Sequence, residues 1–193
     1  MAPSEHPEHV GTGTPGIVGA PNQEKQPAPL KPPGPPRPEA RPAVVLVEPE
    51  IPQNTGNIAR TCAATGFELH LVGTLGFSIS DKHLKRAGLD YWDAVTLVRH
   101  DSLDTFLQAT AERPCFFAST GGGVGYSSYS YPPGSVFVFG RETAGLPRDL
   151  LQRYRGSVMR IPMLPGLRSL NLSNSAAIIV YEAMRQWGFP GCE

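Results

Sequence analysis

Short apolar runs alternate with segments of helical pattern from residue 43 onward. The apolar runs span residues 43–48, 68–73, 94–98, 115–119, 135–140 and 157–163. The helical segments span residues 55–66, 81–88, 102–112 and 147–154, and a last helix ends at Trp187. Because strands that are joined through helices pair in parallel, this alternation predicts an α/β fold with a mostly parallel sheet flanked by helices.

The first 42 residues have a different composition. They hold 12 of the 21 prolines and no apolar cluster, so they cannot bury enough surface to offset the entropy of ordering. We therefore expect 1–42 to be a disordered, proline-rich tail and 43–193 to be one folded domain. The tail lacks the apolar stretch of a targeting peptide, and no run approaches the roughly 18 apolar residues of a membrane span, so we expect no membrane association.

Charged and metal-ligating residues narrow the choice of partners. The net charge is zero, so a polyanion would have to be held by a local basic cluster. The candidates are Lys82, Lys85 and Arg86 in one stretch, and Arg141, Arg148, Arg153, Arg155, Arg160 and Arg168 in another. Ordinary solvated charge explains these residues equally well. The three cysteines and five histidines lack ligand spacing, which predicts no metal site and no disulfide and favours a reducing, cytoplasmic setting.

Three of the expected strands end in loops of unusual composition. The strands at 115–119, 135–140 and 157–163 lead into TGGGVGYSSYS, RETAGLP and LPGLRSLNLSN. Ligands of α/β folds bind at the carboxyl ends of strands, where Gly lets the backbone come close and Ser, Thr and Asn supply hydrogen bonds. This convergence predicts one small-molecule site built from three loops. No helix follows the glycines, which argues against a dinucleotide-binding fingerprint.

The helix expected at 55–66 carries one basic residue among small ones. Asn54 or Thr55 is expected to cap it and Gly66 to end it. Arg60 within it either faces solvent, which composition alone favours, or lies beside a phosphate or sugar.

Four stretches of the chain resemble a known family. EPEIPQNTGNIARTCAATGFELHLV, KRAGLDYWDAV, FVFGRETAGLP and RIPM…RSLNLSNSAAIIVYEA closely resemble the SPOUT superfamily of RNA methyltransferases. Within it they are most similar to the small tRNA ribose methylases that modify the wobble nucleotide, cytidine or uridine 34. The resemblance covers nearly all of residues 43–190, in order and with few gaps.

The resemblance implies a fold, a cofactor and an assembly. The fold is α/β with a deep trefoil knot near the carboxyl end, the cofactor is S-adenosylmethionine, and the enzyme is a homodimer with the cofactor pocket near the subunit interface. The implied cofactor-binding residues are Ala118, Ser119, Thr120, Gly140, Glu142, Ile161, Met163, Ser169, Leu170 and Asn171. The implied functional residues are Asn54, Arg60, Glu142, Ser169 and Asn171.

The resemblance also accounts for the polar residues crowded before the last helix. One of Ser173 and Asn174 is expected to cap that helix, while Ser169 and Asn171 hold the methionine moiety and face the ribose. Leu170 and Leu172 are expected to anchor the loop in the core.

The expected reaction is methyl transfer from S-adenosylmethionine to a ribose 2′-hydroxyl in the tRNA anticodon stem-loop. A guanidinium stays protonated, so Arg60 is expected to grip the neighbouring phosphate rather than act as a base; a deprotonated Arg60 is the alternative. Two other readings stay open, namely a related enzyme acting on another tRNA or rRNA nucleotide, and a cofactor- or RNA-binding protein without catalysis.

Overall fold

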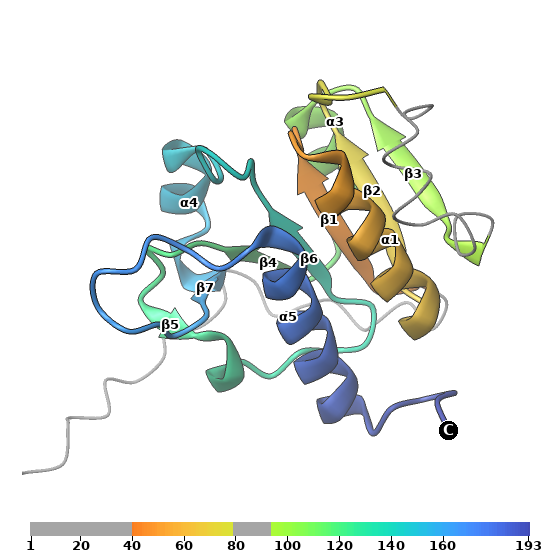
Figure 1. Ribbon diagram of the computed structural model, residues 1–193. Coiled ribbons are helices and arrows are strands. Elements are labelled where there is room, and N and C mark those ends of the chain that lie inside the picture. The colour runs from red at the N-terminus through yellow and green to blue at the C-terminus, as the bar shows by residue number, and fades with distance from the viewer. Residues whose placement is uncertain (1–39, 79–93) are drawn as a thin grey trace, which may run out of the picture.

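The computed structural model describes residues 40–78 and 94–193, and its centre is a parallel sheet of seven strands (Figure 1). The strand order is β3-β2-β1-β6-β4-β7-β5, and every pair in it is parallel. The strands are β1 (Ala43–Val47), β2 (Glu68–Val72), β3 (Leu97–His100), β4 (Cys115–Ala118), β5 (Val124–Gly125), β6 (Val136–Phe139) and β7 (Val158–Arg160). The helices are α1 (Pro52–Thr65), α3 (Leu103–Ala109), α4 (Arg148–Arg153) and α5 (Leu172–Trp187), with single 3₁₀ turns η2 (Tyr126–Ser128) and η3 (Arg155–Ser157).

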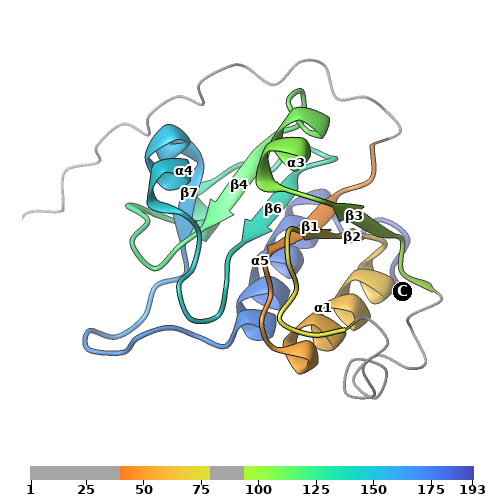
Figure 2. The same cartoon turned by 90° about the horizontal axis from the view of Figure 1, so that it is seen from above.

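Two layers of helices cover the sheet, one on each face (Figure 2). Successive side chains of a strand point to opposite faces, so Val44 and Leu46 of β1 pack with α1 and α5, while Val45 packs with α3 and α4. All five residues of β1 are buried, because β1 lies in the middle of the sheet between β2 and β6. The predicted α/β fold with a parallel sheet flanked by helices is confirmed.

The order of the strands brings the three predicted loops close together. β6 pairs with both β1 and β4, and β4 pairs with β7. The strands that precede the three polar loops are therefore direct neighbours. Since all of them run parallel, their loops leave from one edge of the sheet, as the sequence predicted.

Several local predictions differ from the structure. β3 begins at Leu97 rather than at residue 94, and the two-residue strand β5 was not predicted. α1 is capped by Ile51, with Pro52 in the first turn, and not by Asn54 or Thr55. The expected end of α1 is confirmed, because Gly66 has a φ of 73°, the left-handed conformation that glycine adopts without strain. The helix expected at 81–88 and most of the expected disordered tail lie outside the described residues.

Two features bear on membranes and metals. Among the described residues, no helix is long and apolar enough to cross a membrane. In the same part of the chain, no group of three or more His, Cys, Asp or Glu side chains lies close enough to hold a metal ion.

A histidine pair, with His70 buried and His100 half-buried, joins β2 to β3 beneath α3. The His70 Nε2 group lies 3.1 Å from Glu68 Oε2, and His100 Nε2 lies 3.0 Å from His70 Nδ1. The partners define the tautomers, because the Glu68 carboxylate can only accept and one of the facing ring nitrogens must donate. With both histidines neutral, His70 Nε2 donates to Glu68 and one of the two facing ring nitrogens donates to the other. A second proton on His70 would add a charge to this largely buried site, and His100 would have to accept at Nε2 to keep the bond between the rings.

The environment of the pair keeps it neutral. Burial lowers the pKa of His70, and Arg113 and His100 lower it further, whereas Glu68 raises it. Burial also lowers the pKa of His100, against an opposing effect of Asp101. A histidine whose pKa is lower in the folded than in the unfolded chain stabilises the fold above the unfolded pKa of about 6.5, and this stability is lost as the pH falls.

We therefore expect the free energy of unfolding to fall as the pH is lowered from about 7 to about 5. His70→Gln should make this fall smaller, because the amide can donate to Glu68 and accept from His100 but does not titrate. Urea unfolding of both proteins across this pH range measures the two slopes. Identical slopes would show that the histidine pair does not carry the pH dependence.

Candidate functional site

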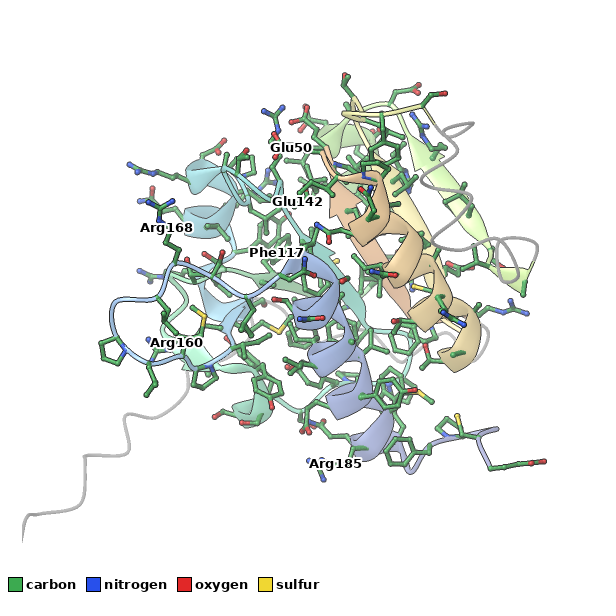
Figure 3. All side chains as sticks on the ribbon, in the orientation of Figure 1. Glu50, Phe117, Glu142, Arg160, Arg168 and Arg185 are labelled. Atoms are coloured by element: carbon green, nitrogen blue, oxygen red, sulfur yellow. The ribbon has the colours of Figure 1, made fainter. Side chains whose placement is uncertain are left out.

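A pocket lies at the edge of the sheet where β4 and β7 end. It is lined by Thr120, Arg160, Ile161, Met163 and the stretch 164–168, and its volume is about 350 Å³, which is within the range of small-molecule sites. Figure 3 shows Arg160, the last residue of β7, and Arg168, in the loop that follows, at the left end of the molecule. The lining combines aliphatic side chains with exposed guanidinium groups and a glycine.

The structure places the ten predicted cofactor residues in two groups. Thr120, Ile161 and Met163 line the pocket, and Ala118 and Ser119 directly precede Thr120 at the end of β4. The other five, Gly140, Glu142, Ser169, Leu170 and Asn171, are not among the lining residues. Ser119 is fixed by its backbone, since its N–H donates to Met159 O at 2.9 Å.

Three of the predicted functional residues form one continuous hydrogen-bond chain. Asn54 Nδ2 donates to Glu142 Oε1 at 3.0 Å, and Asn171 Nδ2 donates to Asn54 Oδ1 at 2.9 Å. Asn171 Oδ1 then accepts from the backbone N–H of Ser173 at 2.9 Å and of Asn174 at 3.3 Å. The chain runs from the loop after β6 through the first turn of α1 to the start of α5. These three side chains thus fix the relative positions of three segments.

Glu142 also takes the place of a local cap on α1. Ile51, the N-cap residue, has no side-chain hydrogen bond to offer. Glu142 accepts from the backbone N–H of Glu50 at 2.9 Å and of Ile51 at 3.2 Å. A carboxylate at a helix N-terminus also interacts favourably with the helix dipole. One side chain from a distant loop therefore holds the start of α1.

Two further contacts tie the same loops together. Arg141 pairs with Glu48, and Thr143 donates from its hydroxyl to Glu50 Oε2 at 2.7 Å. Gly140 permits the tight turn, because a Cβ atom there would lie 2.1 Å from the backbone carbonyl carbon of Gly145. Gly140, which was predicted as a cofactor residue, thus allows two backbone segments to come close together.

The start of α5 corrects two predictions. Asn171 caps α5, rather than Ser173 or Asn174. Leu170 is 39 % exposed and does not anchor the loop, whereas Leu172 packs against the core as expected. Asn171 performs two tasks at once, because its carbonyl oxygen caps the helix while its amide group donates to Asn54.

Arg60 and Ser169 lie outside this network and outside the pocket lining. Arg60 is exposed on α1, six residues after Asn54, or about 9 Å further along the helix axis. Ser169 is exposed in the loop before α5. Within one chain, the structure therefore does not bring Arg60 to the pocket beside β7.

The family follows from a comparison with known proteins. The model of the SpoU rRNA Methylase family matches residues 41–181. This chain belongs to that family.

Individual members of the SpoU family are close in sequence and in fold. The tRNA (cytidine(34)-2'-O)-methyltransferase of Escherichia coli is 48 % identical over 149 residues, which cover 77 % of this chain and 95 % of that protein. A structure solved to study the 2-OH methylation of C/U34 on tRNA is 43 % identical, has a TM-score of 0.74 and covers 77 % and 97 % of the two chains. An AdoMet-bound rRNA methyltransferase from Sinorhizobium meliloti is 29 % identical, has a TM-score of 0.68 and covers 75 % and 56 %.

The role of Glu142 can be tested through stability. Glu142→Gln should lower the free energy of unfolding by about 1–2 kcal/mol, because an amide cannot accept at both oxygens and the charge-assisted bonds to the start of α1 weaken. Urea unfolding measures the loss. Glu50→Gln is the matched control: its half-buried carboxylate contacts the same loop through Thr143, and we expect a smaller loss of about 0.5 kcal/mol. Equal losses in both variants would contradict the central role of Glu142.

Proposed function

We propose that this protein transfers a methyl group from S-adenosylmethionine to the ribose 2′-hydroxyl of the wobble nucleotide, cytidine or uridine 34, in the anticodon stem-loop of tRNA. The observation that carries the proposal is the 48 % identity to the E. coli tRNA (cytidine(34)-2'-O)-methyltransferase across 95 % of its length. An alignment that covers 95 % of the relative leaves little room for an inserted segment or a different fold around the site. The structure solved to study C/U34 methylation supports the same assignment at 43 % identity.

The pocket beside β7 suits the proposed cofactor. Ile161 and Met163 offer aliphatic surface for a planar purine, and Thr120 offers a hydroxyl. Arg160 and Arg168 offer guanidinium groups for a carboxylate. The cofactor supplies a methyl group on a sulfonium, a leaving group that needs no metal. The AdoMet-bound S. meliloti relative, 29 % identical, supports the use of this cofactor.

The protein's task is to position the ribose. A 2′-hydroxyl is a weak nucleophile, and holding reacting groups in line can contribute up to roughly 7–11 kcal/mol in model systems. We assign Arg60 to the phosphate beside the target ribose, because a guanidinium grips phosphate oxygens in a planar fork and its charge favours the ionised hydroxyl. Ser169 is assigned to the ribose side of the site. Asn54, Glu142 and Asn171 act as positioning residues, since their polar atoms are engaged with one another.

We infer that the protein is a homodimer in which the site is completed between subunits. Arg60 is exposed on α1, away from the pocket of its own chain. α1 and α5 lie side by side on one face of the sheet (Figure 1), and Tyr181 of α5 is 50 % exposed there. A second copy that packs on this face would cover Tyr181 and carry Arg60 toward a partner's pocket. We expect the assembly in the cytoplasm, where tRNA is modified.

We also infer that the carboxyl end forms the trefoil knot typical of SPOUT enzymes. The segment between β4 and β6 contacts both the strand and the helix that follow it in sequence. β5 pairs with β7, while the Trp187 Nε1 group donates to Tyr131 O at 2.7 Å and Gln186 Nε2 to Tyr129 O at 2.9 Å. These contacts support a path in which α5 passes through the loop 119–135.

One specific observation supports a second substrate. The matching family model is that of SpoU rRNA methylases, and the AdoMet-bound relative from S. meliloti is an rRNA methyltransferase. Ribosomal RNA is therefore the alternative substrate for the same reaction.

Methyl transfer with a labelled cofactor separates the two substrates. We expect incorporation into bulk tRNA and none into rRNA, and we expect the label at the ribose of nucleotide 34. A tRNA transcript whose nucleotide 34 carries a 2′-deoxyribose is the control and should accept no methyl group. Label in rRNA alone would favour the alternative, and cofactor binding without transfer to any RNA would refute the enzyme assignment.

The role of Arg60 can be separated from cofactor binding. Arg60→Ala should leave the affinity for S-adenosylmethionine nearly unchanged while the single-turnover rate falls by about 100-fold or more, because only the ribose and its phosphate lose a contact. Arg60→Lys should restore little, since an ammonium lacks the planar fork. Light scattering should show the dimer in each variant. If Arg60→Ala keeps more than half of the wild-type rate at saturating substrates, the assignment fails.

A further inference from the structure

The charges of this neutral chain are unevenly distributed along the sequence. Residues 143–181 carry five arginines and a single acidic residue, Asp149, and no lysine. The five are Arg148, Arg153, Arg155, Arg160 and Arg168. The rest of the chain therefore holds four more acidic than basic residues. A net charge of zero conceals a cationic segment and an anionic remainder.

The fold collects the cationic segment at one end of the molecule. Its five arginines lie on α4, η3, β7 and the loop that follows, and α4, β7 and this loop lie at the left end in both ribbon views (Figures 1 and 2). β7 is next to the edge strand β5 of the sheet, whereas β2 and β3 form the opposite end. All five arginines are exposed. Charge separated along the sequence is thus also separated in space.

These arginines differ from others in the same structure by what they contact. Arg113 lies 3.9 Å from Glu68, Arg141 pairs with Glu48, and Arg185 lies 2.8 Å from Glu182. Within residues 40–78 and 94–193, no ion pair is made by Arg148, Arg153, Arg155, Arg160 or Arg168. Unpaired like charges repel one another, so this end of the molecule is stabilised by an anionic partner.

One of these arginines is pre-positioned by the core. The guanidinium of Arg153 lies 5.5 Å from the ring centroid of Tyr154, within the range of a cation–π contact. The Tyr154 ring in turn stacks on Phe117 of β4 at 4.7 Å, and Phe117 is fully buried. Arg153 therefore extends from a support that the core fixes. The Arg153 side chain is therefore already restricted in the free protein, and binding a ligand costs it less conformational entropy.

We propose that Arg148, Arg153 and Arg155, here called the α4 arginines, bind the sugar–phosphate backbone of the substrate tRNA. The inference rests on the proposed function and names the face on which the RNA docks. Arg160 and Arg168 connect this face to the pocket, because both line it. An RNA held by the α4 arginines can continue along Arg160 and Arg168 toward the pocket, so that cationic side chains accompany this path.

Phosphate contacts have a signature that separates them from other contacts. Each neutralised phosphate releases condensed counterions, so the logarithm of the affinity falls linearly with the logarithm of the salt concentration, with a slope of about −0.7 to −0.9 per contact. Removing three such contacts should reduce the slope by about 2–3. The chemistry of the pocket should stay intact, because the α4 arginines do not line it.

The test compares two full-length variants of equal net charge. The first replaces the α4 arginines together, Arg148→Gln, Arg153→Gln and Arg155→Gln. The second, matched control replaces three exposed arginines elsewhere, Arg41→Gln, Arg99→Gln and Arg185→Gln. Figure 3 shows Arg185 at the far end of α5, away from Arg168. Fluorescence anisotropy with labelled tRNA at several salt concentrations gives Kd and the salt slope, and calorimetry gives the cofactor Kd.

We expect the α4 variant to bind tRNA at least roughly tenfold more weakly and to lose about 2–3 from the salt slope. Its KM for tRNA should rise, while kcat at saturating tRNA and the cofactor Kd should stay within about twofold of wild type. The control should bind tRNA within about threefold of wild type. Equal weakening in both variants, or an unchanged slope in the α4 variant, would overturn the proposal. Wild-type protein that methylates no tRNA would refute the proposed function, whereas an active wild type with an unaffected α4 variant would refute this inference alone.

Discussion

The carboxylate of Glu142 connects parts of the chain that are about 90 residues apart in sequence. It accepts two backbone N–H groups at the start of α1 and the side-chain amide of Asn54. Through Asn54 the connection extends to Asn171 and so to the start of α5. The ends of two helices and the loop after β6 thus depend on one acceptor. If the carboxylate were absent, the backbone N–H groups of Glu50 and Ile51 just before α1 would lose their acceptor, and Asn54 would lose the partner that sets its amide orientation.

The residues of the site fall into two groups: those whose polar atoms are hydrogen-bonded within the protein, and those that line the pocket. The polar atoms of Asn54 and Asn171 are largely engaged within the protein, so these residues position segments rather than contact reacting atoms. The pocket beside β7 is lined by other residues, among them Thr120, Ile161 and Met163. A positioning network and a binding pocket placed on neighbouring loops are what a reaction needs when its main difficulty is alignment of a weak nucleophile.

Much of the fold could be predicted from the sequence because its signals are local. The apolar runs of β1, β4 and β6 are continuous, since these strands are buried on both faces of a parallel sheet. The stop at Gly66 needs only a left-handed residue. The start of α1 could not be predicted, because the backbone there is held by Glu142, which lies far away in sequence. β5 was missed because a strand of two residues has no periodic pattern.

In the candidate site, too, contacts between residues far apart in sequence could not be predicted, and Asn171 is an example. The crowded stretch before α5 indicated that some of its polar residues do more than cap a helix, yet the cap was assigned to a neighbour. Asn171 has two functional groups on one side chain, and only the position of Asn54 reveals that both are used. Of the three loops predicted to build one site, those after β4 and β7 supply residues of the pocket lining, whereas the loop after β6 supplies Glu142 to the hydrogen-bond network. Which residues of each loop line the pocket depends on backbone turns that no pattern encodes.

Net charge was the weakest guide to the partner, and the fold explains why. The neutral composition indicated only that a polyanion would have to be held by a local basic cluster, and it did not show where such a cluster lies. The order of the strands places α4, β7 and the loop after them at one end of the sheet, and this segment has five arginines against one acidic residue. Salt screens charges beyond about 8–10 Å, so an approaching polyanion interacts with this end and not with the total. The relevant quantity is the local charge density, and the topology sets it.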